Sequence, residues 1–283
     1  MTKILRGLEV SQYLNEKNKH KIENMKLGGI VPTLGIVRVG NRPDDIAYEM
    51  SAVKKCSSVG IDVKKYVFPE NCTEKDLLET IEKINNEESI HGCLLFRPLP
   101  DNMNEKKICS ALLPQKDIDG ITSGSLAGVF INEPLGFCPC TAQAVMEILH
   151  SYNVDCKGKN AVVLGRSLVV GRPVAMLLMH EGATVTICHS KTLNMSDIVK
   201  RADIVVVATG KMESIGAEYF SQGQIVIDVG IGWNETKGKL CGDVKFDEVE
   251  PIVKAITPVP GGVGSVTTSV LISHIVEAAE KRI

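Results

Sequence analysis

The stretch that decides the fold is Ala161-Val-Val-Leu-Gly165-Arg166-Ser167-Leu-Val-Val-Gly171-Arg172-Pro173. A short apolar strand runs into a turn with two glycines, and Pro173 suits the first turn of a helix. Glycine lets the backbone approach a pyrophosphate closely, and the free N–H groups of a helix N-terminus bind anions. The stretch therefore predicts a dinucleotide-binding turn. Its spacing, GxSxxxG, departs from GxGxxG, and a glycine-rich connection without a ligand also fits the local pattern.

The end of the next expected strand indicates which dinucleotide is bound. NAD-binding folds usually place Asp or Glu there to hold the ribose 2′-hydroxyl. Here the chain continues as His189-Ser190-Lys191-Thr192, without an acid. Cationic and hydroxyl donors suited to a 2′-phosphate are present instead, namely Arg166, Ser167, Ser190 and Lys191. We therefore expect NADP as the cofactor, although Lys191 also fits a solvated loop.

Short apolar runs alternate with amphipathic runs along the chain, a pattern typical of an α/β protein with mainly parallel sheets. Helices are expected at about 46–59 and 267–281, and another follows Thr73, whose spacing to Asp76 predicts a capping box. Strands are expected at 33–39, 63–68, 92–96, 161–164, 183–188, 204–208 and 225–229.

Composition excludes several classes of protein. The 283 residues carry 32 basic and 34 acidic side chains, and 4% are aromatic, which argues against a broad nucleic-acid surface or a base-stacking platform. No apolar run approaches the ~20 residues of a membrane-spanning helix, and the N-terminus lacks a secretory signal. The length suggests roughly two domains, with a boundary in the segment 136–141, which is rich in Pro, Gly and Cys. We expect a cytoplasmic protein.

The nine cysteines are scattered and include no CxxC pair. Several lie in apolar runs, where a free thiol behaves as a small hydrophobic group. We therefore expect reduced, buried thiols. The six histidines are also dispersed, so no metal site is expected.

Two polar residues of the first half are candidates for ligand binding. Tyr48 lies on the helix that follows Val39-Gly40-Asn41-Arg42-Pro43, and Ala52 and Lys55 share its helical face, whereas Lys54 points elsewhere. On local sequence, Tyr48 fits a packing role as well as a ligand role. Asp119 likewise fits ordinary turn chemistry as well as a binding carboxylate.

Taken together, the motifs resemble the bifunctional methylenetetrahydrofolate dehydrogenase/methenyltetrahydrofolate cyclohydrolase family over nearly the whole chain. The matching pieces occur in the family's order: VGNRPDDIAY, RPLP, KDIDG, PCTAQAV, VVLGRSLVVGRP, CHSKT, VVATG, VIDVGI, GDV and ITPVPGGVG. The last of these, which includes 258–264, is highly specific. The resemblance implies a role in one-carbon metabolism.

The resemblance also implies an organisation. Residues 1–139 and 265–283 are expected to form a folate-binding α/β domain, to which the last helix returns. Residues 140–264 are expected to form a Rossmann-type NADP domain, with the active site in the cleft between the two domains. A homodimer through the NADP domain is implied as well.

Site residues carry over by position. Tyr48 should stack on the folate and Asp119 should hydrogen-bond the pterin, which makes them the expected catalytic pair, with Pro98 and Gly262 as further substrate contacts. The resemblance assigns the 2′-phosphate to Arg166, Ser167 and Ser190, beside the Gly165 turn. Near the nicotinamide it places Ile231 and Thr267, alongside the Gly261–Gly262 backbone.

The chain departs from the family at positions that carry chemistry. The family's catalytic lysine follows the tyrosine by four residues, where this chain has Ala52. The glutamine that usually orients the lysine is replaced by Phe96, and Ser265 stands where proline is usual. Opening a methenyl bridge with water needs a positioned general acid/base, whereas hydride transfer relies on the nicotinamide and on alignment.

We therefore expect a dehydrogenase with weak or absent cyclohydrolase activity. Three alternatives stay open: a bifunctional enzyme in which another group, such as Lys55 or Arg97, replaces the lysine; a non-catalytic nucleotide-sensing protein; and a Rossmann dehydrogenase for another small substrate. Lys55 lies on the right helical face but about 5 Å beyond Ala52 along the axis. Arg97 is a poor general base because it is effectively always protonated.

Overall fold

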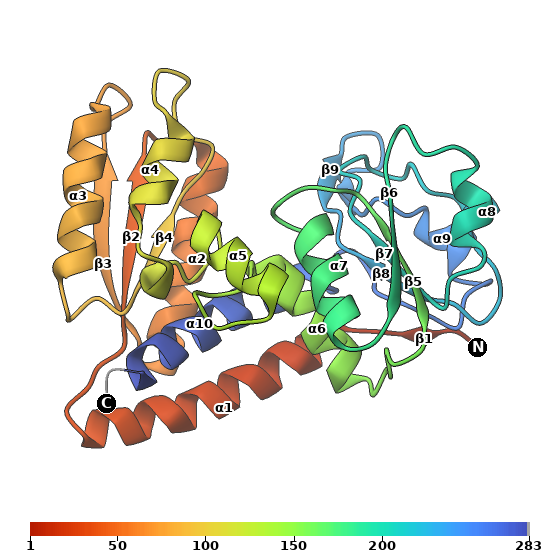
Figure 1. Cartoon of the computed structure of the whole chain (residues 1–283), viewed down its shortest axis with the longest axis horizontal. Coiled ribbons are helices and arrows are strands. Elements are labelled where there is room, and N and C mark those ends of the chain that lie inside the picture. The colour runs from red at the N-terminus through yellow and green to blue at the C-terminus, as the bar shows by residue number, and fades with distance from the viewer. Residues whose placement is uncertain (282–283) are drawn as a thin grey trace. The chain divides into compact units, whose positions relative to one another are not determined.

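The computed structural model describes residues 1–281, which divide into two compact units (Figure 1). The N-terminal unit comprises Tyr13–Cys140 and the residues from Thr268 onward, and the C-terminal unit comprises Met1–Gln12 and Thr141–Thr267. Three helices have residues in both units: α1 (Gly7–Leu27), α6 (Cys140–Ser151) and α10 (Gly264–Glu280). The expected two-domain α/β class is confirmed.

The division differs from the expected one at the N-terminus. The sequence-based division placed residues 1–12 with the first domain, whereas the structure places them in the C-terminal unit. The reason is that β1 (Lys3–Ile4) pairs in parallel with β11 (Ala255–Ile256). Residues 265–267, the first turn of α10, also fall in this unit.

The C-terminal unit is built on a six-stranded sheet in the order β1-β11-β8-β7-β5-β6, in which every pairing is parallel. Its other strands are β5 (Asn160–Leu164), β6 (Thr184–Cys188), β7 (Ile204–Val207) and β8 (Ile225–Asp228). The remaining elements are α7 (Gly171–His180), α8 (Met195–Val199), a 3-10 turn η2 (Ala217–Tyr219), α9 (Phe246–Val249) and an antiparallel pair, β9 (Gly232–Asn234) with β10 (Lys239–Cys241).

The N-terminal unit contains a three-stranded parallel sheet in the order β3-β2-β4. Its strands are β2 (Thr33–Val39), β3 (Asp62–Phe68) and β4 (Gly92–Leu95), and its helices are α2 (Pro43–Val59), α3 (Glu74–Asn86), α4 (Glu105–Ala111), η1 (Pro114–Lys116) and α5 (Ser123–Ile131). One core cluster joins Val37 and Leu95 of the sheet to Leu77 and Ile81 of α3 and Ile108 of α4. Burial of these side chains drives the packing of both helices on the sheet.

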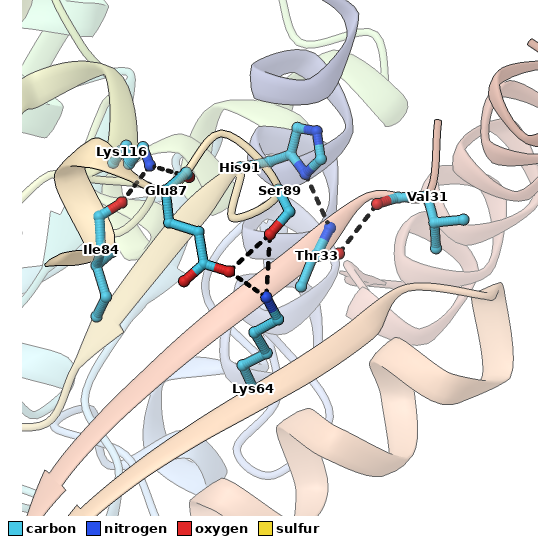
Figure 2. A network of polar contacts seen from close by, with 8 residues as sticks. All are labelled: Val31, Thr33, Lys64, Ile84, Glu87, Ser89, His91 and Lys116. Atoms are coloured by element: carbon cyan, nitrogen blue, oxygen red, sulfur yellow. Dashed lines mark hydrogen bonds and ion pairs between the residues drawn. The ribbon is translucent and has the colours of Figure 1, made fainter. Parts of the chain in front are cut away.

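A network of hydrogen bonds and an ion pair lies at the C-terminal end of α3 (Figure 2). The ammonium of Lys116, only 1% exposed, donates to the carbonyls of Ile84 and Glu87, the latter at 2.7 Å. The Glu87 carboxylate in turn pairs with Lys64 and accepts from Ser89 Oγ at 2.8 Å. A cation here satisfies the Ile84 carbonyl, which the helix leaves unpaired, and adds a second donor to the Glu87 carbonyl, which also accepts from the N–H of Ile90.

Candidate active site

A cavity of about 450 Å³ lies at the carboxyl ends of β5, β6 and β7 in the C-terminal unit. This is the edge of a parallel sheet at which α/β folds bind nucleotides. Its wall includes Gly165, Arg166 and Ser167 from the first turn, and His189 and Ser190 from the end of β6. The residues predicted to bind the 2′-phosphate are therefore brought together.

Close backbone approach explains the two glycines of the first turn. Gly165 has φ +128°, and a Cβ there would lie 2.2 Å from the Ala208 carbonyl oxygen. A Cβ on Gly171 would lie 2.2 Å from the oxygen of Gly165. The Ser167 hydroxyl accepts hydrogen bonds from the N–H groups of Val170 (3.1 Å) and Gly171 (3.4 Å), so it also organises the start of α7.

The cavity wall contains residues that the sequence did not single out. His189, Lys211 and Tyr219 line it, whereas Lys191 is exposed and does not. The Lys191 N–H donates to His189 Nδ1 at 3.2 Å, which leaves Lys191 as part of a turn. Two cationic side chains, Arg166 and Lys211, with several hydroxyls suit an anionic dinucleotide.

A second cavity, of about 160 Å³, adjoins the loops after β8 and β11. Ile231 and Gly262, both predicted site residues, line it. Thr267 does not, but its hydroxyl donates to the Val263 carbonyl at 3.3 Å, and Val263 is part of the cavity wall.

Two buried carboxylates hold these loops. Asp243 accepts from the N–H groups of Thr209 (2.6 Å) and Gly210 (2.8 Å), behind the first cavity. Asp228 accepts from the N–H groups of Gly230 (3.0 Å), Asp243 (3.1 Å) and Val244 (2.9 Å). Burial raises the pKa of Asp228 to about 7, although the backbone hydrogen bonds oppose the shift.

In the N-terminal unit, Tyr48 and Phe96 are packed against each other. Their ring centroids are 5.6 Å apart at an interplanar angle of 61°, an edge-to-face contact. Tyr48 is 37% exposed and Phe96 7%. Burial and the Asp119 carboxylate raise the pKa of the Tyr48 hydroxyl, so it stays protonated. Ala52, one helical turn after Tyr48, is fully buried.

An ion pair fixes the helix beside Tyr48. Glu49, 5% exposed, accepts from Arg38 Nε at 2.7 Å and from Lys65 Nζ at 2.8 Å. Burial acts to raise the pKa of Glu49, but the bonds from Lys65 and Arg38 outweigh it and lower the pKa. The ionised Glu49 thus anchors α2 to β2 and β3.

Asp119 lies in the loop after η1, close to a second acid. Burial and the neighbouring Asp117 raise its pKa to about 6, whereas Arg97 and a hydrogen bond with Cys140 act to lower it. Asp117 itself accepts from the N–H groups of Ile121 (3.0 Å) and Thr122 (2.7 Å). Asp119 thus lies near Tyr48 and Arg97, whereas Pro98 lines a separate cavity of about 490 Å³ with Asn41.

The comparisons with known proteins match both units. Residues 5–119 match the catalytic domain of the tetrahydrofolate dehydrogenase/cyclohydrolase family, and residues 139–283 match its NAD(P)-binding domain. The chain belongs to this family. It is therefore an enzyme with a catalytic domain and an NAD(P)-binding domain, and the predicted family and nicotinamide-type cofactor are confirmed.

Relatives in the family span the full chain. A bifunctional protein FolD of Carboxydothermus hydrogenoformans is 51% identical over 99% of this chain and 98% of its own length. The crystal structure of the bifunctional enzyme FolD from Campylobacter jejuni, 37% identical, covers all of both chains with a TM-score of 0.97. A Trypanosoma brucei family structure, complexed with NADP cofactor and an inhibitor, is 33% identical over 99% of this chain and 98% of its own, with a TM-score of 0.92.

Ala52 and Phe96 stand at the two positions where the sequence analysis expects the family's lysine and glutamine. Both side chains are buried hydrophobic groups, so neither donates nor accepts a proton.

Among residues 1–281, no three His, Cys, Asp or Glu side chains are grouped to hold a metal ion. None of the helices in that range has the length and apolar character needed to cross a membrane.

Proposed function

We propose that the chain oxidises 5,10-methylenetetrahydrofolate to 5,10-methenyltetrahydrofolate with NADP and has little or no cyclohydrolase activity. The observation that carries the second part is the edge-to-face packing of Phe96 on Tyr48 beside the buried Ala52. Hydrophobic packing fills the positions at which the family has its lysine and glutamine. Methenyltetrahydrofolate is then released as the product.

The cofactor cavity fits NADP. Gly165 and Gly171 lack the Cβ atoms that would close the turn, and Arg166, Ser167 and Ser190 offer donors to a 2′-phosphate. NADP supplies the hydride acceptor when it is bound. Ile231, Gly262 and Thr267 are proposed to align the nicotinamide end, and Gly165 the pyrophosphate.

Tyr48 and Asp119 are proposed as the folate-binding pair, with Pro98 as a further contact. Loss of hydride leaves positive charge on the bridge carbon and its two nitrogens. An ionised Asp119 on the pterin stabilises that charge more than it stabilises the neutral substrate. No proton transfer from protein is required for this step, so the loss of a lysine does not abolish it.

The decisive experiment measures both activities on the same purified protein. NADP reduction with methylenetetrahydrofolate reports the dehydrogenase, and the decay of supplied methenyltetrahydrofolate reports the cyclohydrolase. We expect clear turnover in the first assay and the uncatalysed rate in the second. Enzyme-dependent hydrolysis comparable to the dehydrogenase rate would contradict the loss of cyclohydrolase, and NADP binding without reduction would contradict the enzyme assignment.

A gain-of-function variant tests the proposed reason for the loss of cyclohydrolase activity. The double change Ala52→Lys with Phe96→Gln restores the amine and its orienting amide, and we expect enzyme-dependent hydrolysis to rise by about 100-fold, the lower end of what general acid–base catalysis contributes. Ala52→Met with Phe96→Gln is the matched control, because it adds a side chain of similar length without the amine. Equal hydrolysis by both variants would contradict the argument.

A second candidate function is a bifunctional enzyme that uses Lys55. Burial lowers the pKa of Lys55, which makes its amine easier to deprotonate, and it shares the helical face of Tyr48. If the unmodified protein hydrolyses methenyltetrahydrofolate, Lys55→Ala should abolish that activity while Lys54→Ala retains it. Arg97→Ala tests the other cation in the same assay.

We also propose a cytoplasmic homodimer. The nine cysteines, all within the described residues, form no disulfide, as suits a reducing compartment. The β9–β10 hairpin of the NAD(P)-binding unit exposes Trp233 (59%), an apolar surface for a second copy to cover. Analytical ultracentrifugation should give twice the chain mass, and Trp233→Ser should lower it.

A further inference from the structure

One buried carboxylate connects the loops of the first cavity, of about 450 Å³, and the second, of about 160 Å³. Asp243 follows β10, is 1% exposed and lines neither cavity. Its Oδ2 accepts from the N–H groups of Thr209 at 2.6 Å and Gly210 at 2.8 Å. Thr209 belongs to the wall of the first cavity, which also contains Arg166. Asp243 therefore fixes that wall from behind.

The same residue is joined to the loop of the second cavity. The Asp243 N–H donates to Asp228 Oδ1 at 3.1 Å, and this oxygen also accepts from the N–H of Gly230 at 3.0 Å. Gly230 lines the second cavity, and a Cβ there would lie 2.2 Å from Asp243 Oδ1. The Asp228 N–H in turn donates to Thr257 Oγ1 at 2.8 Å, next to the segment 258–265 of the same cavity wall. Asp243 thus contacts both loops.

Two more contacts hold the loop after β7 against the segments that follow β8. The Glu213 N–H donates to the carbonyl of Gly242, the residue before Asp243, at 2.9 Å. A Cβ on Gly232, the first residue of β9, would lie 2.6 Å from Met212 Sδ, so the thioether packs closely on this strand. The loops of the two cavities therefore form one connected unit, and the Asp243 side chain supplies two of its hydrogen bonds.

We propose that Asp243 is a positioning residue for the cofactor: it holds the wall of the first cavity at a fixed spacing from the loop of the second, so that the two ends of one dinucleotide fit both cavities. A two-ended ligand gains affinity from both ends only where the two subsites are held at the matching distance. This inference rests on the proposed function, in which the first cavity takes the 2′-phosphate end of NADP and the second the nicotinamide end.

Calorimetric titration of Asp243→Ala with two probes tests the proposal: NADP, and adenosine 2′,5′-bisphosphate, the part of NADP that carries the 2′-phosphate. The variant leaves the N–H groups of Thr209 and Gly210 without this acceptor. We expect the Kd for NADP to rise by about 10- to 30-fold. The Kd for the fragment should rise by about threefold at most, because the fragment occupies the first cavity alone. An unchanged Kd for NADP, or an equal rise for both probes, would overturn the proposal.

Two matched variants show whether the acceptor itself matters. Asp243→Asn keeps a side-chain oxygen, and a single oxygen already accepts both N–H bonds, so the Kd for NADP should stay within about twofold. Asp203→Ala removes the same kind of bond, from the Asn160 N–H to Asp203 Oδ2 at 2.9 Å, at the amino ends of β5 and β7. Its Kd for NADP should be unchanged. A loss in either variant equal to that in Asp243→Ala would contradict the proposal.

Steady-state kinetics separates positioning from a loss of folded protein. In Asp243→Ala the KM for NADP should rise with its Kd, while the KM for the folate at saturating NADP stays unchanged. A purely structural defect lowers the active fraction, and therefore kcat, and leaves both KM values as they were. If Asp243→Ala does not fold, Asp243→Glu decides. It keeps the carboxylate on a side chain one carbon longer, which displaces the 209–210 backbone, so an unchanged Kd for NADP there contradicts the proposal.

The outcomes separate this inference from the proposed function. An unmodified protein that binds NADP but does not oxidise methylenetetrahydrofolate would overturn the proposed function, and the titrations would still test Asp243 because they need no turnover. An active unmodified enzyme whose Kd for NADP is the same in folded Asp243→Ala would overturn the positioning role alone.

Discussion

We propose that Arg166 selects between NADP and NAD at the nucleotide site. It lines the cofactor cavity with Ser167 and Ser190, and no acid follows β6 to hold a ribose 2′-hydroxyl. A guanidinium can bind a 2′-phosphate through two hydrogen bonds, whereas it gains little from a hydroxyl. We therefore propose that a preference for NADP over NAD depends largely on this side chain.

We expect Arg166→Ala to raise the KM for NADP by about 10- to 100-fold, since a hydrogen bond to a charged group contributes about 1.5–3 kcal/mol. The KM for NAD should change by no more than about twofold. Steady-state kinetics with both cofactors checks this result. Arg172→Ala, which does not line the cavity, is the control. An equal rise in KM for both cofactors would show that Arg166 does not bind the 2′-phosphate.

At the scale of elements, α3 shows a helix whose two ends are stabilised in different ways. Its N-terminus carries the predicted capping box, in which Thr73 accepts from the N–H of Asp76 and Asp76 accepts from the N–H of Thr73. Its C-terminus depends on Lys116, more than thirty residues beyond Ile84 in the chain (Figure 2). Local spacing predicts the first end and says nothing about the second.

Lys116→Met should destabilise the protein by about 1–3 kcal/mol, because it leaves the buried Ile84 carbonyl without a donor and removes one of the two donors to the Glu87 carbonyl. Methionine retains most of the volume, so the loss reports the ammonium rather than a cavity. Denaturant unfolding measures the change. The exposed Lys106 on α4 is the control, and Lys106→Met should stay within about 0.5 kcal/mol of the original. An unchanged free energy of unfolding in Lys116→Met would contradict this role of the ammonium.

Helix α1 is an element that the sequence did not predict. Val10, Leu14, Ile22 and Met25 are buried, but charged and polar residues surround them and two of the buried positions are polar. One of these, Asn18, donates to Ser273 Oγ at 2.8 Å, a partner 255 residues away. The helix is stabilised by tertiary contacts more than by its own pattern.

At the scale of the whole molecule, burial of acids sets how stability depends on pH. The folded pKa values of Asp228, about 7, and Asp119, about 6, lie above the ordinary value of an aspartate. Folding therefore favours their protonated forms. Their contribution to stability is fully present below about pH 4 and is lost as the pH rises through 6 to 7.

We expect the melting temperature of the unmodified protein to fall relative to that of Asp228→Asn between pH 5 and pH 8, because the amide has no proton to lose. Asp228→Asn also exchanges one acceptor for a donor opposite the N–H of Val244, which lowers stability by an amount independent of pH. Calorimetry gives the slope of melting temperature against pH for each protein, and comparing the two slopes removes the pH-independent loss of stability. Parallel slopes would mean that Asp228 is ionised at both pH values.

The sequence by itself determined the parallel α/β class, the strands β2 to β8, the glycine turn and the expected NADP donors. These features are encoded locally, in periodicity, capping and turn chemistry, which a single stretch of chain expresses on its own. The resemblance to the family added Tyr48, Asp119 and the two departures at Ala52 and Phe96. The pairing of β1 with β11 and the place of Lys211 in the cofactor cavity had no local signal.

Only the tertiary structure decided what surrounds the site residues. It packs Phe96 on Tyr48, and it brings Cys140 and His274 to one carbonyl oxygen across 22 and 156 residues of chain. A thiol and an imidazole so far apart carry no mutual pattern in sequence. Their chemistry depends on burial and on the partner of each proton, and both arise only when the chain is folded.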